Sequence, residues 1–139
     1  MNRPGVIIID DEPDLVVELA EWFETQGWRV ETGHSASDAL RLLSNGRHID
    51  CLITDQLMPS ESGDELLRQL RALPRAVQPD LIAVMTGQDR TTNQLEPEGA
   101  DVVFLKPVDP AAMLTSIAAR LRTSLRNGPA ESAAAVEFA

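Results

Sequence analysis

Acidic side chains that could bind a metal ion stand directly after two short apolar runs. Asp10 and Asp11 follow the run Val6–Ile9, and Asp55 follows the run Cys51–Thr54. Carboxylates that gather at one place raise one another's pKa unless a cation lies among them. Hard oxygen ligands of this kind are those that Mg²⁺ prefers. The pattern favours a magnesium site, provided that the fold brings the two segments together.

A hydroxyl and an ammonium group stand after two later apolar runs. Thr86 follows Leu81–Met85, and Lys106 follows Val102–Leu105. Lys106 is the only lysine among the 12 lysines and arginines of the chain. Because a compact ammonium acts as a point charge toward phosphate, whereas arginine presents a planar fork, we interpret this lysine as a phosphate-facing cation.

Each of these features has an ordinary explanation when it is taken alone. Acidic residues at the start of a helix complement its dipole, so Asp10, Asp11 and Glu12 would fit a first helical turn. Thr86-Gly87 would fit a turn. The conjunction carries more weight, because four successive strand ends each offer a polar group suited to one task.

Strand and helix patterns alternate along the chain and would position these groups. Four of the five apolar runs lack polar alternation, as expected of parallel strands that are covered on both faces. Helical patterns lie between them, although Gln88–Gly99 is a poor helix because it contains Pro97. We expect one doubly wound α/β domain with five parallel strands and five helices on both faces of the sheet. The expected strands are Val6–Ile9, Trp28–Thr32, Cys51–Thr54, Leu81–Met85 and Val102–Leu105.

Composition sets the remaining limits. The folded domain should cover residues 1–126, with residues 127–139 as a flexible tail or linker, because Asn127-Gly128-Pro129 ends the last helical pattern. A formal charge of −10 disfavours a nucleic-acid surface, and no apolar run is long enough for a membrane span. The single Cys51 lies in an apolar run and suits a reduced, cytoplasmic protein.

The ordered set of strand-end residues resembles the receiver domain of two-component response regulators, which has a CheY-like, flavodoxin-like fold. The resemblance spans roughly Val6 to Arg126. It rests on Ile9-Asp10-Asp11-Glu12, Asp55-Gln56-Leu57-Met58-Pro59, Thr86-Gly87 and Lys106-Pro107.

The resemblance implies phosphorelay signal transduction in a bacterial cytoplasm. It makes Asp55 the residue phosphorylated by a sensor histidine kinase or a histidine phosphotransfer protein. Asp11, Asp55 and the backbone carbonyl of Leu57 would bind Mg²⁺ directly, and Asp10 would act through a water molecule. The chain would then be no enzyme beyond its own Mg²⁺-dependent phosphorylation and dephosphorylation.

The resemblance also implies how the phosphoryl group is recognised and read. Thr86, followed by Gly87, would be the switch hydroxyl, and Lys106 would neutralise the phosphoryl oxygens. The bond before Pro107 would be cis, which a proline permits. A downstream protein or a fused effector domain would receive the signal, without direct nucleic-acid or membrane binding by this domain, and a homodimer is possible.

Three positions depart from the usual pattern of that family. Val103 stands where an aromatic switch residue is common. Leu57 and Gln88, two residues after Asp55 and Thr86, should border the approach of water and tune the lifetime of the phosphorylated state.

Three other interpretations were weighed. A receiver that is never phosphorylated and acts as a protein-binding module is the main alternative. A phosphatase with an aspartyl-phosphate intermediate would carry a second aspartate two residues after the first, where Leu57 stands. A dinucleotide-binding fold would have a glycine-rich turn where Asp10-Asp11-Glu12-Pro13 stands.

Overall fold

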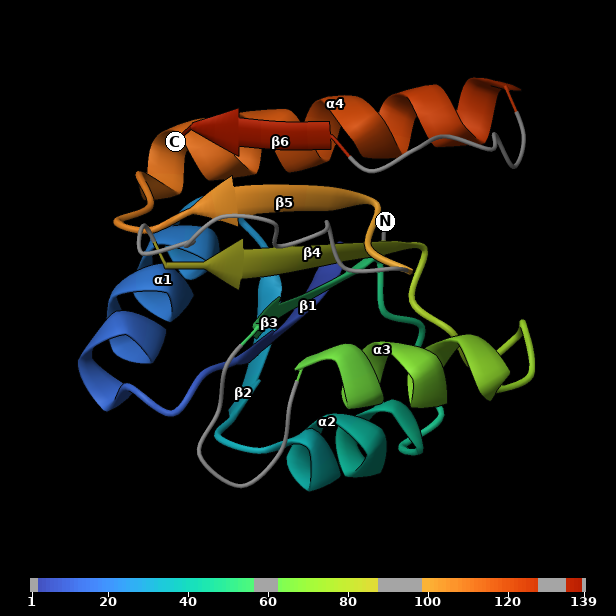
Figure 1. The fold of residues 1–139 in the computed structure, drawn as a ribbon. Coiled ribbons are helices and arrows are strands. Elements are labelled where there is room, and N and C mark those ends of the chain that lie inside the picture. The colour runs from blue at the N-terminus through green and yellow to red at the C-terminus, as the bar shows by residue number, and fades with distance from the viewer. Residues whose placement is uncertain (1–2, 57–62, 88–98, 128–134, 139) are drawn as a thin grey trace.

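The computed structural model describes residues 3–56, 63–87, 99–127 and 135–138 (Figure 1). Strands and helices alternate through most of this part of the chain. In order they are β1 (Gly5–Ile9), α1 (Pro13–Thr25), β2 (Arg29–Gly33), α2 (Ala36–Leu43), β3 (Cys51–Asp55), α3 (Gly63–Ala72), β4 (Leu81–Thr86), β5 (Val102–Leu105), α4 (Pro110–Asn127) and β6 (Ala135–Phe138).

All pairs of neighbouring strands are parallel, in the order β2-β1-β3-β4-β5-β6. The chain moves outward in one direction from β1 to β2 and in the other from β3 to β6, so the order reverses between β1 and β3. Ile9 lies opposite Thr54, which brings the carboxyl ends of these two strands together. Ligands of doubly wound sheets bind at such a reversal point. The fold therefore places its binding crevice where the acidic residues stand.

Alternate residues of the strands enter two separate hydrophobic cores. Ile7 and Ile9 belong to the core that includes buried residues of α2 and α3. Val6 and Ile8 belong to the core that includes buried residues of α1 and α4. Figure 1 shows these two helix pairs on opposite sides of the sheet. Because both faces are covered, every residue of β1, β3 and β4 is buried, as the unbroken apolar runs predict, whereas the edge strand β2 is only partly buried.

The observed sheet confirms the doubly wound α/β fold and adds one strand to the five predicted. The sequence predicts a flexible tail or linker for residues 127–139, whereas α4 continues to Asn127 and Ala135–Phe138 pairs in parallel with β5. Val136 and Phe138 are residue types that favour strands, and β6 satisfies backbone groups that β5 would otherwise present as a free edge. The helix predicted within Gln88–Gly99 lies outside the described residues, except for Gly99.

Among the described residues, no helix combines the length and the apolar character that crossing a bilayer requires.

Candidate functional site

Asp10 leaves the end of β1 and is held in place from both sides. Its N–H donates to the carbonyl oxygen of Gly33 at 3.2 Å, which continues the pairing with β2 by one residue. Its Oδ1 accepts the N–H of Glu12 at 2.9 Å. Pro13 then begins α1 in the first-turn position, where its missing N–H leaves no hydrogen bond unmade. The side chain of Asp10 is fully buried by this arrangement.

Asp55 ends β3 beside Asp10, because Thr54 is paired with Ile9 across the sheet. Its side chain is also buried. Carboxylate oxygens of Asp10, Asp11 and Asp55 lie within 4.8 Å of one another, and Asp11 is the exposed member. Three hard oxygen donors at this spacing fit Mg²⁺, which combines few carboxylates with several waters. The structure thus brings together the three aspartates that the sequence predicts for a metal site.

Lys106 brings a positive charge to the same carboxylates from the end of β5. Its Nζ lies 3.0 Å from Oδ2 of Asp10, 3.2 Å from Oε1 of Glu12 and 3.4 Å from Oδ1 of Asp55. The N–H of Lys106 donates to the carbonyl oxygen of Thr86 at 2.8 Å, which fixes where the side chain starts. The peptide bond between Lys106 and Pro107 is cis.

The electrostatics of the cluster show a deficit of positive charge. Burial and then the charge of Asp10 raise the pKa of Asp55 to about 6, against the opposing effect of Lys106. Burial also raises the pKa of Asp10, although the N–H of Glu12 and the ammonium of Lys106 lower it. Burial lowers the pKa of Lys106, but the hydrogen bond to Asp10 and the charge of Asp55 outweigh it and raise this pKa. One ammonium therefore does not balance the clustered carboxylates.

Thr86 and Gly87 form the fourth strand end of the site. Thr86 is buried at the end of β4, and its hydroxyl donates to the carbonyl oxygen of Gly87 at a long 3.4 Å. A Cβ atom added at Gly87 would meet no atom of the described residues within 4 Å, its two chain neighbours aside. Gly87 and Lys106 line a cavity of about 670 Å³ together with Glu12, Leu15, Glu18, Pro107 and Val108. The cavity therefore borders the cluster through Glu12 and Lys106, which both line it.

The remaining predicted positions divide into two groups. Leu57 and Gln88 lie outside the described residues, so their effect on lifetime stays a prediction. Val103 is fully buried in the core shared by α2 and α3. Valine has no aromatic ring, so this position fills the core and offers no aromatic side chain that could change its orientation.

Two neighbours of the site received no role from the sequence. Glu12 forms an ion pair with Lys106, although it reads as an ordinary first-turn charge. His34 follows β2, and its Nδ1 lies 3.0 Å from the backbone oxygen of Asp10. Since β2 is parallel to β1 and lies beside it, the carboxyl ends of both strands meet at one edge of the sheet. The position of His34 directly after β2 could therefore have pointed to it from the sequence.

Comparison with known proteins gives one consistent result. The sequence model described as the response regulator receiver domain matches residues 6–118. The protein PetR of Rhodobacter capsulatus is 33% identical over 121 residues, which are 87% of this chain and 50% of PetR. The response regulator SaeR of Staphylococcus aureus is 30% identical over 112 residues, covering 81% of this chain and 48% of SaeR. The chain thus spans about half the length of these curated relatives.

Solved structures agree on the fold. A CheY-like response regulator receiver domain protein from Methanospirillum hungatei superimposes with a TM-score of 0.77 and 24% identity. The match covers 91% of this chain and all of that one. At this identity the likeness concerns the arrangement of strands and helices, which is the doubly wound arrangement described above.

Proposed function

This chain belongs to the response regulator receiver domain family of two-component signalling, and from that premise we propose that it accepts a phosphoryl group on Asp55. The observation that carries the proposal is the convergence of Lys106 on Asp55 and Asp10 at the reversal point of the sheet. A lysine and an aspartate that are 51 positions apart in sequence (106 − 55 = 51) meet within 3.4 Å, and the lysine also lines a cavity of about 670 Å³.

In the proposed reaction a carboxylate oxygen of Asp55 attacks the phosphorus of a phosphohistidine on the partner. A phosphorus–oxygen bond forms and the phosphorus–nitrogen bond breaks, and its electron pair stays on the imidazole nitrogen. The product is an acyl phosphate on Asp55. Lys106 lies close enough to Asp55 to neutralise the charge on the transferring oxygens, which is the main task of a protein in phosphoryl transfer.

A magnesium ion held at the aspartates would supply the further positive charge that the phosphoryl oxygens need. The contacts of the carboxylates suggest how the ligands divide. Oδ1 of Asp10 accepts the N–H of Glu12 and Oδ2 accepts from Lys106, so both oxygens are already engaged. Asp11 is exposed and Asp55 lies close to it, so these two are the direct ligands in our proposal. The backbone carbonyl of Leu57, the third ligand that the family resemblance implies, lies outside the described residues.

In our proposal Thr86 responds to the phosphorylated state. Within the described residues, its hydroxyl makes one hydrogen bond, a long one to the neighbouring carbonyl of Gly87. The oxygens of an acyl phosphate are charged acceptors and form stronger hydrogen bonds than a neutral carbonyl. Phosphorylation would therefore favour a Thr86 hydroxyl turned toward Asp55. Since Thr86 pairs with Leu105, the change would reach β5 and α4 and alter the surface that they form.

The proposed partners follow from this chemistry. The phosphoryl donor is a sensor histidine kinase or a histidine phosphotransfer protein. The recipient of the signal is a downstream protein or an effector domain fused to this one, in the cytoplasm. The domain catalyses only its own phosphorylation and dephosphorylation.

The test is intact-protein mass spectrometry after incubation with acetyl phosphate and Mg²⁺. Wild type and Asp14→Asn should each gain one phosphoryl group, because Asp14 is an exposed aspartate of α1 outside the cluster. Asp55→Asn should gain none. If wild type itself takes up no phosphoryl group under these conditions, the alternative of an unphosphorylated protein-binding module is favoured instead.

A further inference from the structure

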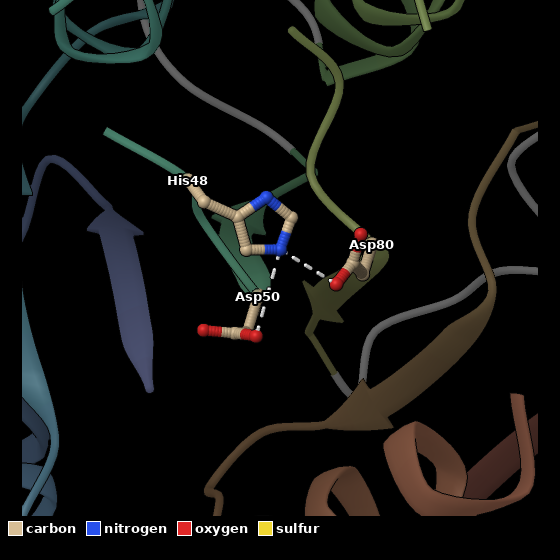
Figure 2. Close-up of side chains that lie close together, drawn as sticks. All are labelled: His48, Asp50 and Asp80. Carbon is tan, nitrogen blue, oxygen red and sulfur yellow. Dashed lines mark hydrogen bonds and ion pairs between the residues drawn. The ribbon is translucent and has the colours of Figure 1, made fainter. Parts of the chain in front are cut away.

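At the amino ends of β3 and β4, opposite the aspartate crevice, one imidazole and two carboxylates point toward one another (Figure 2). Nε2 of His48 lies 2.8 Å from Oδ2 of Asp80 and 3.7 Å from Oδ1 of Asp50. We propose that His48, Asp50 and Asp80 form a second metal site, one that binds a divalent transition-metal ion such as Zn²⁺. This site is separate from the proposed phosphorylation site and does not depend on it.

The sheet itself brings the two carboxylates together, and His48 reaches them from the segment that precedes β3. Cys51 is paired with Leu81, so the residues just before them, Asp50 and Asp80, stand side by side at the start of β3 and β4. Backbone hydrogen bonds extend this pairing, from the N–H of Leu81 to the oxygen of Asp50 at 3.0 Å and from the N–H of Asp80 to the oxygen of Ile49 at 3.2 Å. The positions of the side chains are thus set by the register of the sheet.

Asp50 is oriented by a contact outside the cluster. Its N–H donates to the oxygen of Gly5 at 2.9 Å, and its Oδ2 accepts the N–H of Gly5 at 2.7 Å. One carboxylate oxygen is therefore fixed by β1, and Oδ1 is left to face His48. Carboxylates that bind metal ions are commonly held by such an outer hydrogen bond. The arrangement is preorganised on one side before any ion arrives.

The type of ligand selects the class of metal. Imidazole nitrogen suits Zn²⁺ and neighbouring transition metals, whereas Mg²⁺ takes oxygen ligands. Ligand atoms about 2.0–2.2 Å from a tetrahedral Zn²⁺ lie roughly 3.3–3.6 Å from each other. The two distances from His48 fall on either side of that range, so small side-chain rotations would create the geometry. Three protein ligands leave the fourth position of a tetrahedral ion open.

Space for that fourth ligand adjoins the site. His48 and Asp50 line a cavity of about 450 Å³ with Arg3, Pro4, Arg29 and Arg47. Arg29 is held there by a hydrogen bond from its Nη2 to the backbone oxygen of His48 at 2.7 Å. Three guanidinium groups around the cavity would draw an anion, such as hydroxide, phosphate or a carboxylate, to the open side of the ion.

The test uses the fact that the chain contains two histidines. Zn²⁺ is titrated at pH 7.5 into protein saturated with Mg²⁺, and the ring signals of His48 and His34 are followed by nuclear magnetic resonance. The proposal predicts that the His48 signals shift and reach a limit at one equivalent, while those of His34 stay in place. His48 signals that do not move in excess Zn²⁺, or a shift of both histidines together, would overturn the site.

Variants separate metal binding from a simple ion pair. Asp80→Asn and His48→Gln should each weaken Zn²⁺ binding by more than about tenfold, since even the loss of an outer hydrogen bond to a ligand weakens metal sites by roughly that factor. Asp14→Asn, an exposed aspartate of α1, should bind as wild type does. Circular dichroism verifies that each variant is folded. Equal Zn²⁺ affinity in wild type and Asp80→Asn would show that His48 and Asp80 form only an ion pair.

Discussion

The two ends of the sheet carry similar side chains in different surroundings. At the carboxyl ends Asp10 is fully buried and Asp55 is 7% exposed, whereas at the amino ends the His48 side chain is 58% exposed and that of Asp80 is 38% exposed. Charge is costly where water is excluded, so the carboxylates at the carboxyl ends repel each other strongly. A bound cation or a phosphoryl group would change this repulsion. Burial, more than residue type, distinguishes the two clusters.

The largest expected difference between the two ends concerns Lys106. Lys106→Met leaves Asp10 and Asp55 buried without their counter-charge and should lower the free energy of unfolding by about 3–4 kcal/mol without Mg²⁺. The matched control is Arg41→Met, which breaks the exposed pair with Asp38 and should lower it by less than about 1 kcal/mol. Urea unfolding at pH 7.5 measures both. Equal losses would remove the distinction between buried and exposed charge.

The next effect is a pH dependence that belongs to Asp55. Its pKa of about 6 in the folded protein lies above the ordinary value of 3.8, so the folded state binds the proton more tightly. This contribution to stability is complete below pH 3.8 and is lost as the pH rises through 6. Without Mg²⁺, Asp55→Asn should therefore exceed wild type by about 2–3 kcal/mol at pH 7.5, at about 1.4 kcal/mol per pKa unit.

The same pair of proteins should be nearly equal in stability at pH 4, where Asp55 is mostly protonated in the folded state. Urea unfolding at the two pH values provides the comparison. A constant difference between the proteins from pH 4 to 7.5 would contradict a raised pKa at Asp55.

The Mg²⁺ affinity should depend on Asp11 more than on its neighbour Asp10. Asp11→Asn should weaken Mg²⁺ affinity by about tenfold or more, which corresponds to roughly 1.4 kcal/mol. Asp10→Asn should have a smaller effect, because Asp10 already contacts Lys106 and the N–H of Glu12. Titration calorimetry measures both affinities. Equal Mg²⁺ affinities of the two variants would show that the contacts of Asp10 with Lys106 and Glu12 do not keep it from binding the ion.

The smallest effect is expected at the amino ends of the strands. Without added metal, His48→Gln removes an exposed contact with Asp80 and should change the free energy of unfolding by less than about 1 kcal/mol. Thermal unfolding after chelation provides the measurement. A loss of unfolding free energy as large as that of Lys106→Met would mean that the contact between His48 and Asp80 stabilises the fold as a buried ion pair does.

The sequence predicts that the carboxyl-end residues share one edge of the sheet, because they follow unmistakable strands, and the structure brings them together there. Asp55 and Lys106 each come directly after an apolar run, and parallel strands carry such residues to one edge. The contacts of Glu12 and His34 were not predicted from the sequence. Glu12 reaches Lys106 through its long side chain, and His34 lies beside the backbone of Asp10. Both contacts depend on three-dimensional packing.

The amino-end cluster and the sixth strand show the same limit. His48 and Asp80 are 32 positions apart in sequence (80 − 48 = 32), and they meet because β3 lies beside β4 and His48 stands just before β3. Ala135–Phe138 is a short run after a polar segment, and its pairing depends on the edge that β5 presents. Short-range patterns hold no information on either contact.

The most direct test of the account locates the phosphoryl group on the chain. After reaction with acetyl phosphate and Mg²⁺, the acyl phosphate is trapped by borohydride reduction and the protein is cut with trypsin. Cleavage after Arg47 and Arg68 gives one peptide, residues 48–68, that holds both Asp50 of the exposed end and Asp55 of the buried end. We predict that fragmentation of this peptide places the reduced residue at position 55. Modification at Asp50, or in the peptide that holds Asp10 and Asp11, would contradict the account.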